Sequence, residues 1–355
     1  MKKYLTLIGI SLLFISYVSA QSDLPENFNP EPRGLKGLRV MFYNVENLFD
    51  TKDDSLKHDE EFLPDGDRHW NEYRFWEKIN HISSVIISVG GWEPPGIIGL
   101  CEVENLNALK ALFYGSGLKK YHYDIIHFES PDIRGIDVAL AYRPKKLTLL
   151  RKRAIPVFLG EHSRRPTRDI LYAKFLTLSE DTLHLFINHW PSRWGGEEAT
   201  RPKRIRAAQT LRYFTDSLSN LTTDQNIVIM GDFNDGPDNE SIQETLSAKD
   251  TAKDSYLVNL MAAHKKNNSG THFYKEATGA EWHILDQIIV SRPLLNRKNL
   301  YTQPKAHIYK AAFLLTNDDG IKKPFRSFLG YRYIGGYSDH LPIYFDINFT
   351  DATLE

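Results

Sequence analysis

The stretch Asn226–Asp235 constrains the fold most, because it joins a strand-like run to closely spaced polar side chains. Its first half, Asn-Ile-Val-Ile-Met, is apolar and mostly β-branched after the asparagine, which is typical of a buried strand. Gly231 permits a sharp turn, and Asp232 and Asn234 follow one residue apart, so that both face the same way in an extended segment. A carboxylate and an amide held there can orient a water beside a metal-bound phosphate. Taken alone, the stretch is more typical of a plain turn that closes a strand, because Asp and Asn favour turns.

The same pattern, a polar residue beside an apolar run, recurs along the chain. Asp286 stands inside Ile-Leu-Asp-Gln-Ile-Ile-Val, where a carboxylate is costly to bury without a partner such as a metal or a histidine. The donors carry oxygen or imidazole nitrogen and no thiol, so they suit Mg²⁺, Mn²⁺ or Ca²⁺ better than zinc. The complete set is Asn44, Glu102, His189, Asp232, Asn234, Asp286, Asp339 and His340.

These residues extend from 44 to 340 in a chain of 355 residues. Length alone would suggest two domains. A site assembled from such distant positions requires one domain that folds them together, and we therefore predict a single domain over residues 38–350.

The first 20 residues are typical of a secretory signal peptide. A basic start at Lys2 and Lys3 precedes an apolar run that ends in Val18-Ser19-Ala20. This run is shorter than the roughly 20 apolar residues that span a membrane, and no later segment is apolar enough to span one. We expect a mature chain that begins at Gln21, is exported to the periplasm or the medium, and has no stable membrane insertion. Residues 21–37, rich in proline, asparagine and charge, are predicted to form a flexible leader.

Charge limits the partners. The chain has 44 basic and 45 acidic residues, and loss of the two lysines with the signal peptide changes the net charge from −1 to −3. This excludes a globally basic nucleic-acid-binding protein but permits a local basic patch. Cys101 is the only cysteine, so no intrachain disulfide can form.

Strands outnumber helices in the apolar periodicity. Helical spacing predicts helices over 71–89, with Asn71 as a possible N-cap, over 105–113 and over about 203–218. Alternating or continuous apolar runs predict strands at 38–43, 97–101, 121–128, 136–142, 147–150, 170–176, 182–188, 227–230, 282–291 and 343–349.

Six motifs in this order resemble the endonuclease/exonuclease/phosphatase family, over roughly residues 38–349. They are Tyr43-Asn-Val-Glu-Asn47, Gly99-Leu-Cys-Glu-Val-Glu104, Asn188-His-Trp-Pro-Ser192, Gly231-Asp-Phe-Asn234, Leu285-Asp286 and Ser338-Asp-His340. The resemblance implies an α/β fold: a four-layer sandwich of two mixed β-sheets flanked by helices, with the catalytic site at one edge.

The resemblance also implies a metal site. Glu102 is then the principal metal ligand, assisted by Asn44 and Asp339. Mg²⁺ is the expected ion, with Mn²⁺ or Ca²⁺ as alternatives. Glu104, two residues after Glu102, is an alternative ligand.

The catalytic roles implied by the resemblance concern water and phosphate. Asp232 orients or deprotonates the attacking water, and Asn234 holds the phosphate or the water. His340 contacts the phosphate and is paired to Asp286, which keeps it cationic. His189 contacts the phosphate from the other side.

Two further residues, Asp137 and Cys101, have less certain roles in the sequence. Asp137 is a candidate partner for His189, although a simple strand-end salt bridge explains it equally well. Cys101 is interpreted as a buried spacer rather than a nucleophile.

Two basic stretches bear on the substrate. In 193–206, next to His189, we expect Arg193 and Arg204 to bind substrate phosphates. The longer basic stretch 143–168 is more simply a solvated face. The aromatic run 325–337 could line the cleft or contact lipid, but packing is the simpler interpretation.

The sequence thus favours an exported, metal-dependent phosphoesterase, a phosphodiesterase that cleaves nucleic acid by attack of water on phosphorus. The alternatives are an enzyme acting on a lipid headgroup, a sugar phosphate or an inositol phosphate, and a binding protein that kept the fold without catalysis. No feature predicts an oligomeric state.

Overall fold

The computed structural model describes residues 24–349 except 26–27, 161–164, 223, 254, 268, 277–278, 297–299 and 319. The predicted signal peptide, residues 1–20, lies outside the described residues. Across the part of the chain that the structure describes, no helix is both long and apolar enough to cross a membrane.

The first of two large sheets has seven strands in the order β14-β20-β1-β2-β4-β3, with β15 paired to β20. β1 runs parallel to β2 and antiparallel to β20, so the sheet is mixed. Its strands are β1 (Gly37–Leu48), β2 (Ile97–Val103), β3 (Asp124–His127), β4 (Asp137–Tyr142), β14 (Leu300–Thr302), β15 (His307–Ile308) and β20 (Ile343–Phe349).

The second sheet also has seven strands, in the order β5-β6-β7-β8-β13-β10-β9. β7 and β8 are parallel, and β13 runs antiparallel to β8. Its strands are β5 (Leu147–Ile155), β6 (Ile170–Thr177), β7 (Thr182–His189), β8 (Asn226–Asp232), β9 (Ala248–Lys249), β10 (Leu257–Asn259) and β13 (Asp286–Ser291).

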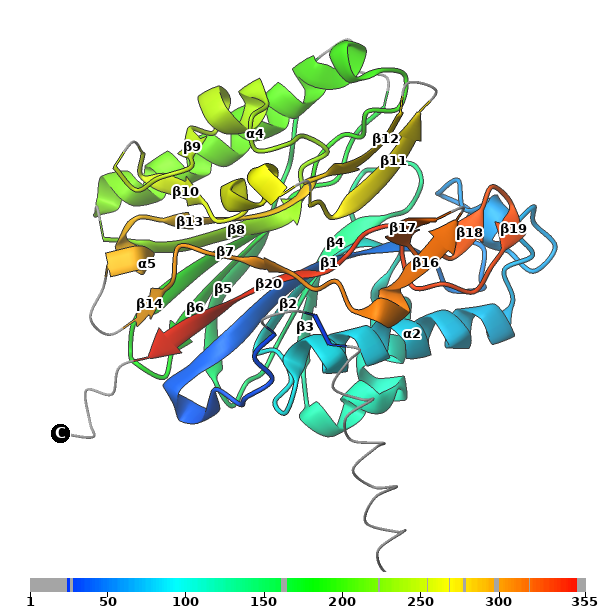
Figure 1. The fold of residues 1–355 in the computed structure, drawn as a ribbon, viewed down its shortest axis with the longest axis horizontal. Coiled ribbons are helices and arrows are strands. Elements are labelled where there is room, and N and C mark those ends of the chain that lie inside the picture. Colours follow the sequence, from blue (N-terminus) through cyan, green and yellow to red (C-terminus); the bar gives the residue numbers. More distant parts are fainter. Residues whose placement is uncertain are drawn as a thin grey trace, which may run out of the picture.

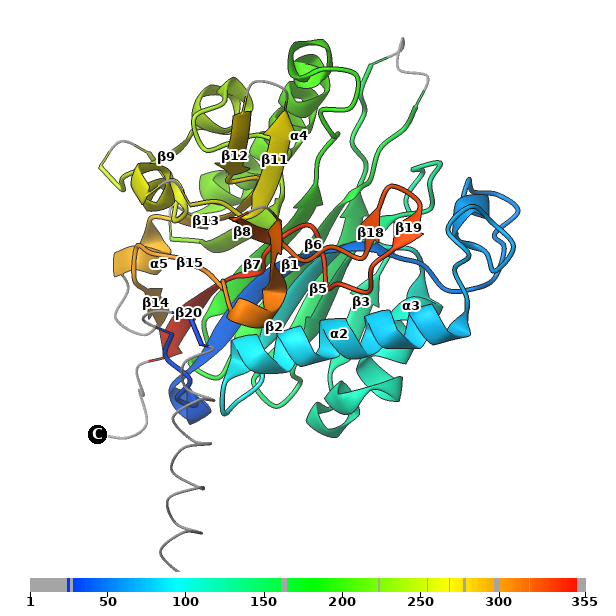
Figure 2. The same ribbon diagram turned by 45° about the vertical axis from the view of Figure 1, so that its right-hand side comes forward.

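The sheets pack face to face, and helices cover their outer faces (Figures 1 and 2). The core between the sheets contains Phe42 of β1 and Phe175 of β6. A second core joins the outer face of the first sheet to α2 (Glu72–Gly90) and α3 (Leu106–Lys110). A third joins the second sheet to α4 (Glu197–Leu221). These layers confirm the predicted four-layer α/β sandwich. Among the described residues, the remaining α-helix is the short α5 (Pro293–Asn296).

The helix that the sequence predicted over 71–89 is α2. Asn71 caps α2, because its side chain accepts a hydrogen bond from the Arg74 amide at 3.1 Å. Ile79, Ile82 and Ile86 are fully buried on one face, at the three- and four-residue spacing of an amphipathic helix.

Three short hairpins complete the fold: β11 (His272–Glu276) with β12 (Gly279–His283), β16 (Leu315–Asp318) with β17 (Ile321–Pro324), and β18 (Phe328–Leu329) with β19 (Arg332–Tyr333). Phe328 is only 5% exposed and lies 5.9 Å from the Trp70 ring and 5.2 Å from the Tyr333 ring. This part of the aromatic run packs within the protein, as the simpler interpretation expected.

Part of the predicted leader contacts the first sheet. The Phe28 ring lies 5.1 Å from the Tyr309 ring, and Arg33 forms an ion pair with Asp346 of β20 at 2.5 Å. A 3₁₀ turn, Gly34–Lys36, then leads into β1.

Candidate active site

The predicted site residues lie at one edge of the sandwich, where strand ends from both sheets meet. β1 and β2 run parallel, so Asn44 and Glu102 are at the same end of the first sheet. β7 and β8 run parallel with His189 opposite Asp232. β13 runs the other way and therefore begins at this edge, with Asp286 opposite Asp232. The topology thus explains why residues so far apart in sequence come together.

Gly231 serves close packing between strands rather than a turn. A Cβ at this position would lie 2.3 Å from the carbonyl oxygen of Asn188 on β7. The chain turns instead at Asn234, which has a φ of 51° and donates its backbone N–H to Asp232 Oδ1 at 2.9 Å. The turn predicted at Gly231 is therefore displaced to Asn234. The Asp–Asn pair both forms a turn and supplies polar groups to the site.

The Asn44 amide links the two sheets. Its Nδ2 donates to Asp232 Oδ2 at 3.1 Å and to Glu102 Oε1 at 3.4 Å. Its Oδ1 accepts the backbone N–H of Glu46 at 3.0 Å, which fixes the orientation of the amide. Glu102 Oε2 accepts the backbone N–H of Asn47 at 3.0 Å. Asn44, Glu102 and Asp232 are therefore brought together.

Glu102 stands at a bulge in β2. The register with β4 shifts between Cys101 and Val103, and Glu102 has a φ of 62°. Bulges of this kind redirect a side chain at the edge of a sheet. Cys101 is buried and burial raises its pKa well above the usual value, which fits a spacer rather than a nucleophile.

Glu104, the alternative ligand, points elsewhere. Its Oε2 accepts the Asp50 backbone N–H at 2.5 Å. Burial, with Asp50, Asp59 and Asp54 nearby, raises the pKa of Glu104 to about 8. The structure therefore places Glu102, and not Glu104, beside Asn44.

His340 and Asp286 form the predicted pair. His340 Nδ1 lies 2.6 Å from Asp286 Oδ2, and Asp286 is fully buried. Burial opposes a charge on the imidazole, but the Asp286 carboxylate, followed by those of Asp232 and Asp339, raises the pKa of His340 well above its usual value. His340 is therefore an imidazolium whose Nε2 lies 3.9 Å from Asp232 Oδ2.

His189 lies at a similar distance from Asp232 but has no such partner. Its Nε2 lies 3.7 Å from Asp232 Oδ2 and 3.8 Å from Glu102 Oε1. Burial, followed by Arg168 and Arg134, lowers the pKa of His189 well below its usual value. Its Nδ1 is buried and makes no hydrogen bond among the described residues. His189 is therefore neutral.

Asp137 is not the partner of His189. It lies 3.1 Å from His127 Nε2 and accepts the Ser130 backbone N–H at 2.9 Å. The alternative of a salt bridge at the strand end describes it correctly.

Asp232 is at the centre of the group. Burial raises the pKa of its carboxyl group to about 6, although the nearby His340 charge opposes the shift. A base with a pKa near neutral pH is well suited to accept a proton from water.

Asp339 has two neighbours that the sequence did not indicate. Arg326 Nη2 donates to Asp339 Oδ2 at 3.0 Å, and the other end of this guanidinium lies 3.3 Å from Glu46 Oε1. His272 Nε2 lies 3.9 Å from Asp339 Oδ2, and its ring centroid lies 4.6 Å from that of His340. Burial and the His340 charge lower the pKa of His272 to about 3, so this imidazole is neutral.

The predicted substrate-binding role of Arg204 is wrong, because its side chain is fully buried. Arg204 Nε lies 2.7 Å from Asp235 Oδ1, and its Nη1 donates to Thr200 Oγ1 at 2.8 Å. A guanidinium with these partners cannot reach a substrate outside. It instead fixes the turn after β8 to α4.

Arg193 has a similar position nearer the surface. It donates from Nε to the carbonyl oxygen of Asn234 at 2.7 Å and from Nη1 to Glu197 at 2.8 Å. Asn234 in turn donates its side-chain amide to the carbonyl of Trp190 at 3.1 Å. Arg193 is thus engaged with the turn that carries Asn234.

The donor set suits a divalent cation. Asp232, Asp286 and His340 lie close enough to share an ion, as do His272, Asp339 and His340, but a protonated His340 cannot be a ligand. Asn44 and Glu102 offer an amide and a carboxylate instead, and Mg²⁺ commonly takes one or two carboxylates with water and phosphate oxygens. These two residues would hold the ion. Asp339, the third predicted ligand, forms an ion pair with Arg326.

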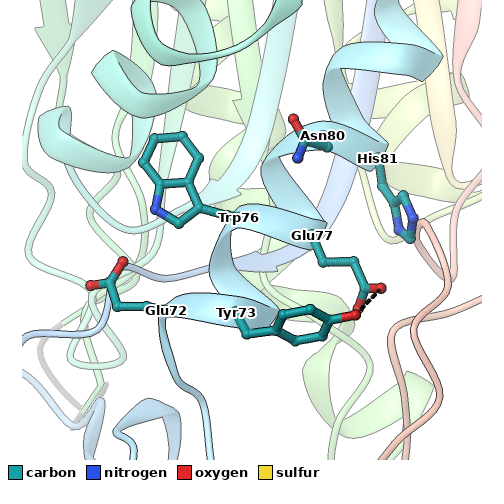
Figure 3. A pocket seen from close by; sticks show the side chains of 6 residues that line it. All are labelled: Glu72, Tyr73, Trp76, Glu77, Asn80 and His81. Carbon is teal, nitrogen blue, oxygen red and sulfur yellow. Dashed lines mark hydrogen bonds between the residues drawn. The ribbon is translucent and has the colours of Figure 1, made fainter.

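A separate pocket on α2 contains none of these residues. Glu72, Tyr73, Trp76, Glu77, Asn80 and His81 line it (Figure 3). Its one internal hydrogen bond, from the Tyr73 hydroxyl to Glu77 at 3.4 Å, joins two side chains of the helix surface. It offers no group positioned for hydrolysis.

Two mixed sheets with carboxylates, an amide and an Asp–His pair at a shared edge define a protein with a phosphoesterase fold. The chain belongs to the endonuclease/exonuclease/phosphatase family, whose model matches residues 39–349. No curated protein matches the chain.

Solved structures share the fold at low identity. An endonuclease/exonuclease/phosphatase family protein from Bacteroides thetaiotaomicron has a TM-score of 0.54 at 15% identity, covering 89% of this chain and 98% of its own. The D. rerio TDP2 complexed with single-strand DNA product has a TM-score of 0.54 at 15% identity, with coverage of 88% and 99%. The mannosyl-6-phosphatase of Bacteroides thetaiotaomicron has a TM-score of 0.55 at 15% identity, with coverage of 88% and 100%.

Proposed function

We propose that this protein is a metal-dependent phosphodiesterase that hydrolyses nucleic acid after export from the cell. The observation that carries the chemistry is Asp232, a carboxylate flanked by a charged and a neutral histidine and joined through Asn44 to Glu102. The same geometry supports hydrolysis of phosphate esters in general, and a neighbouring surface supports nucleic acid as the substrate.

Each side chain has a distinct task. Asp232 accepts a proton from the attacking water, and the Asn44 amide holds its carboxylate in place. His340, charged by Asp286, donates a hydrogen bond to a phosphate oxygen on which negative charge develops. A divalent cation, which Glu102 and Asn44 would hold, would supply further neutralisation of that charge.

The supporting surface is a crevice beside the segment that follows His189. Trp194 is 78% exposed, and the Arg165 guanidinium lies 5.5 Å from its ring centroid. Arg134 and Lys203 line the same crevice. The combination of an exposed aromatic ring and cations suits a strand whose bases stack and whose phosphates are neutralised.

This crevice is connected to the site through Arg168. The buried guanidinium of Arg168 donates to the carbonyl oxygens of His189 at 3.1 Å and of Trp190 at 2.5 Å. A strand in the crevice would therefore lie next to the histidine that faces Asp232. We call this crevice the Trp194 surface.

A substrate panel tests the proposal. Supercoiled plasmid, a single-stranded oligonucleotide, sphingomyelin vesicles, a sugar monophosphate and bis-p-nitrophenyl phosphate are each incubated with Mg²⁺ and with EDTA. We expect cleavage of both nucleic acids and of the small diester, lost in EDTA and in Glu102→Gln. Release of phosphate from the sugar with intact DNA would indicate a phosphatase, and no hydrolysis at all would indicate a binding protein.

Variants of the Trp194 surface test the substrate class separately from the chemistry. Trp194→Ala and Lys203→Ala should each weaken oligonucleotide binding about tenfold, and Lys203→Ala should also make binding less sensitive to salt, with hydrolysis of the small diester unchanged. Trp92→Ala is the matched control, since Trp92 is 72% exposed and follows α2. Unchanged oligonucleotide binding in both surface variants would contradict a role for this crevice.

Export has its own test. Mass spectrometry of the protein from culture medium and periplasm should show a chain that begins at Gln21. Retention of residues 1–20 on that material, or its confinement to the cytoplasm, would contradict export.

A further inference from the structure

A second cluster of metal-ligating side chains lies at the edge of the first sheet. β3 and β4 pair antiparallel with His127 opposite Ala139. Continuing this register by two residues sets Glu129 opposite Asp137, and residues two apart share one face of a strand. His127, Glu129 and Asp137 therefore project to the same side, and one donor atom of each lies within 4.8 Å of the others.

The histidine of this cluster is oriented by a carboxylate. His127 Nε2 lies 3.1 Å from Asp137 Oδ2, and Asp137 is only 1% exposed. An imidazole that donates one N–H to a buried carboxylate presents the lone pair of its other nitrogen, which is the usual arrangement of a metal-binding histidine. Here the other nitrogen, Nδ1, faces Glu129.

The gap between Nδ1 and Glu129 fits an ion. His127 Nδ1 lies 3.8 Å from Glu129 Oε1, which is too long for a hydrogen bond. Two donors each about 2.1 Å from one cation can be separated by up to about 4.2 Å. Glu129 is 57% exposed, so an ion can enter from solvent.

A further carboxylate and one lysine lie near this cluster. Asp169 lines the same crevice as Asp137, and its Oδ1 is buried without a hydrogen-bond partner in the described residues. Lys57, the neighbouring cation, donates its Nζ to the carbonyl oxygens of Ser130 and Asp132.

We propose that His127 and Glu129, with Asp137 orienting the histidine, form a second divalent-metal site that is distinct from the catalytic site. The mixed nitrogen and oxygen donors suit Zn²⁺ or Mn²⁺, whereas Mg²⁺ prefers an all-oxygen shell. The two sites therefore select different ions.

An ion here braces the segment that supports the catalytic edge. Residues 130–136 connect Glu129 to Asp137. Within this segment, Asp132 pairs with Arg168 at 2.9 Å. Arg168 in turn holds the carbonyl oxygens of His189 and Trp190. The proposed role is structural: the ion stabilises the connection without contact with the substrate.

Zinc binding by variants tests this site. Wild type, Glu102→Gln, His127→Gln and Glu129→Gln are titrated with Zn²⁺ alone, and bound zinc is counted after dialysis. We expect His127→Gln and Glu129→Gln to lose one zinc equivalent, or to bind it at least tenfold more weakly, and to retain Mg²⁺-dependent hydrolysis of bis-p-nitrophenyl phosphate. Glu102→Gln should keep this zinc.

The controls separate a metal site from an ion pair. His122→Gln removes an exposed histidine from the same segment and should leave zinc binding unchanged. Glu129 is exposed, so its variant stays folded even if His127→Gln does not, and circular dichroism verifies both. Identical zinc isotherms for wild type and Glu129→Gln, with His127→Gln folded and also unchanged, would show that His127 and Asp137 form only a structural ion pair.

Discussion

Asp232 has a histidine on each side, and the two are in opposite charge states. His189 Nε2 and His340 Nε2 lie 3.7 Å and 3.9 Å from the same carboxylate oxygen. Both imidazoles are buried, and burial alone disfavours their charge. His340 has Asp286 behind it at 2.6 Å, whereas His189 Nδ1 has no hydrogen-bond partner among the described residues. The two buried histidines beside one carboxylate oxygen therefore differ in charge: the raised pKa of His340 favours the cation, and the lowered pKa of His189 favours the neutral form.

This difference in charge assigns different catalytic roles to His340 and His189. A cation beside Asp232 can bind phosphate and stabilise developing negative charge. A neutral imidazole can accept or relay a hydrogen bond but adds no charge. Proton transfer in the proposed reaction therefore centres on Asp232, with His340 as the electrostatic side and His189 as the neutral side.

Removal of the shared carboxylate should have the largest effect. Asp232→Asn keeps the shape and the hydrogen bond to the turn but cannot accept a proton, so we expect kcat/KM for the small diester to fall about 10³-fold. Circular dichroism should show an intact fold, because a buried group with a pKa of about 6 is easily replaced by a neutral one. Activity within tenfold of wild type would contradict the assignment of Asp232 as the base.

Removal of the Asp286 carboxylate should lower the pKa of His340 and so bring its charge state closer to that of the neutral His189. Asp286→Asn takes away the main charge that raises the pKa of His340, so we expect about a 10²-fold loss of kcat/KM near neutral pH. The imidazolium would also deprotonate at lower pH, and the alkaline limb of the rate profile would move to lower pH. The profile of kcat/KM against pH measures this shift.

The other Asp–His pair supplies the matched control. Asp137→Asn makes the same change beside His127, outside the catalytic edge, and should leave the rate profile in place. Identical profiles for wild type and Asp286→Asn would indicate that Asp286 is purely structural.

Loss of His189 should have a smaller effect of a different kind. His189→Gln retains a hydrogen-bonding side chain and removes no charge, because His189 is neutral. We expect about a tenfold lower kcat, consistent with the loss of one neutral hydrogen bond to the reacting groups, and no change in the alkaline limb. A displaced alkaline limb in this variant would show that His189 is charged in the working enzyme.

Much of this edge could be predicted from the sequence because its signals are local. Asp232, Asp286 and Glu102 each stand within or at the end of an apolar strand. A single polar residue next to such a run is visible in the sequence and indicates a polar strand end. The order of the motifs then implied the fold, and the two mixed sheets confirmed it.

The partners across the site were not predictable in the same way. His272 reaches the site through a single bridge to His340, and Arg326 reaches Asp339 from the loop between β17 and β18; neither has a distinctive local pattern. Arg204 belongs to a basic run that looks exposed in sequence, and only its contact with Asp235 shows that it is buried. Contacts between residues far apart in the sequence determine the partners and the burial of these side chains. The local sequence pattern does not show such contacts.

The smallest expected effect concerns the free energy of unfolding. It tests whether burial keeps a histidine at this edge neutral in the folded protein. Burial lowers the pKa of His272 to about 3, against about 6.5 in an unfolded chain. The unfolded chain therefore takes up a proton at a higher pH than the folded protein does, and stability is lost as pH falls below about 6.5. For metal-free protein, this residue alone should reduce the free energy of unfolding by about 1 kcal/mol between pH 7 and 5.5. His272→Gln should remove that part of the pH dependence, as measured by urea unfolding in EDTA at the two pH values. An equal pH dependence in wild type and variant would mean that His272 already carries a proton, and that Asp339 outweighs burial and the charge of His340.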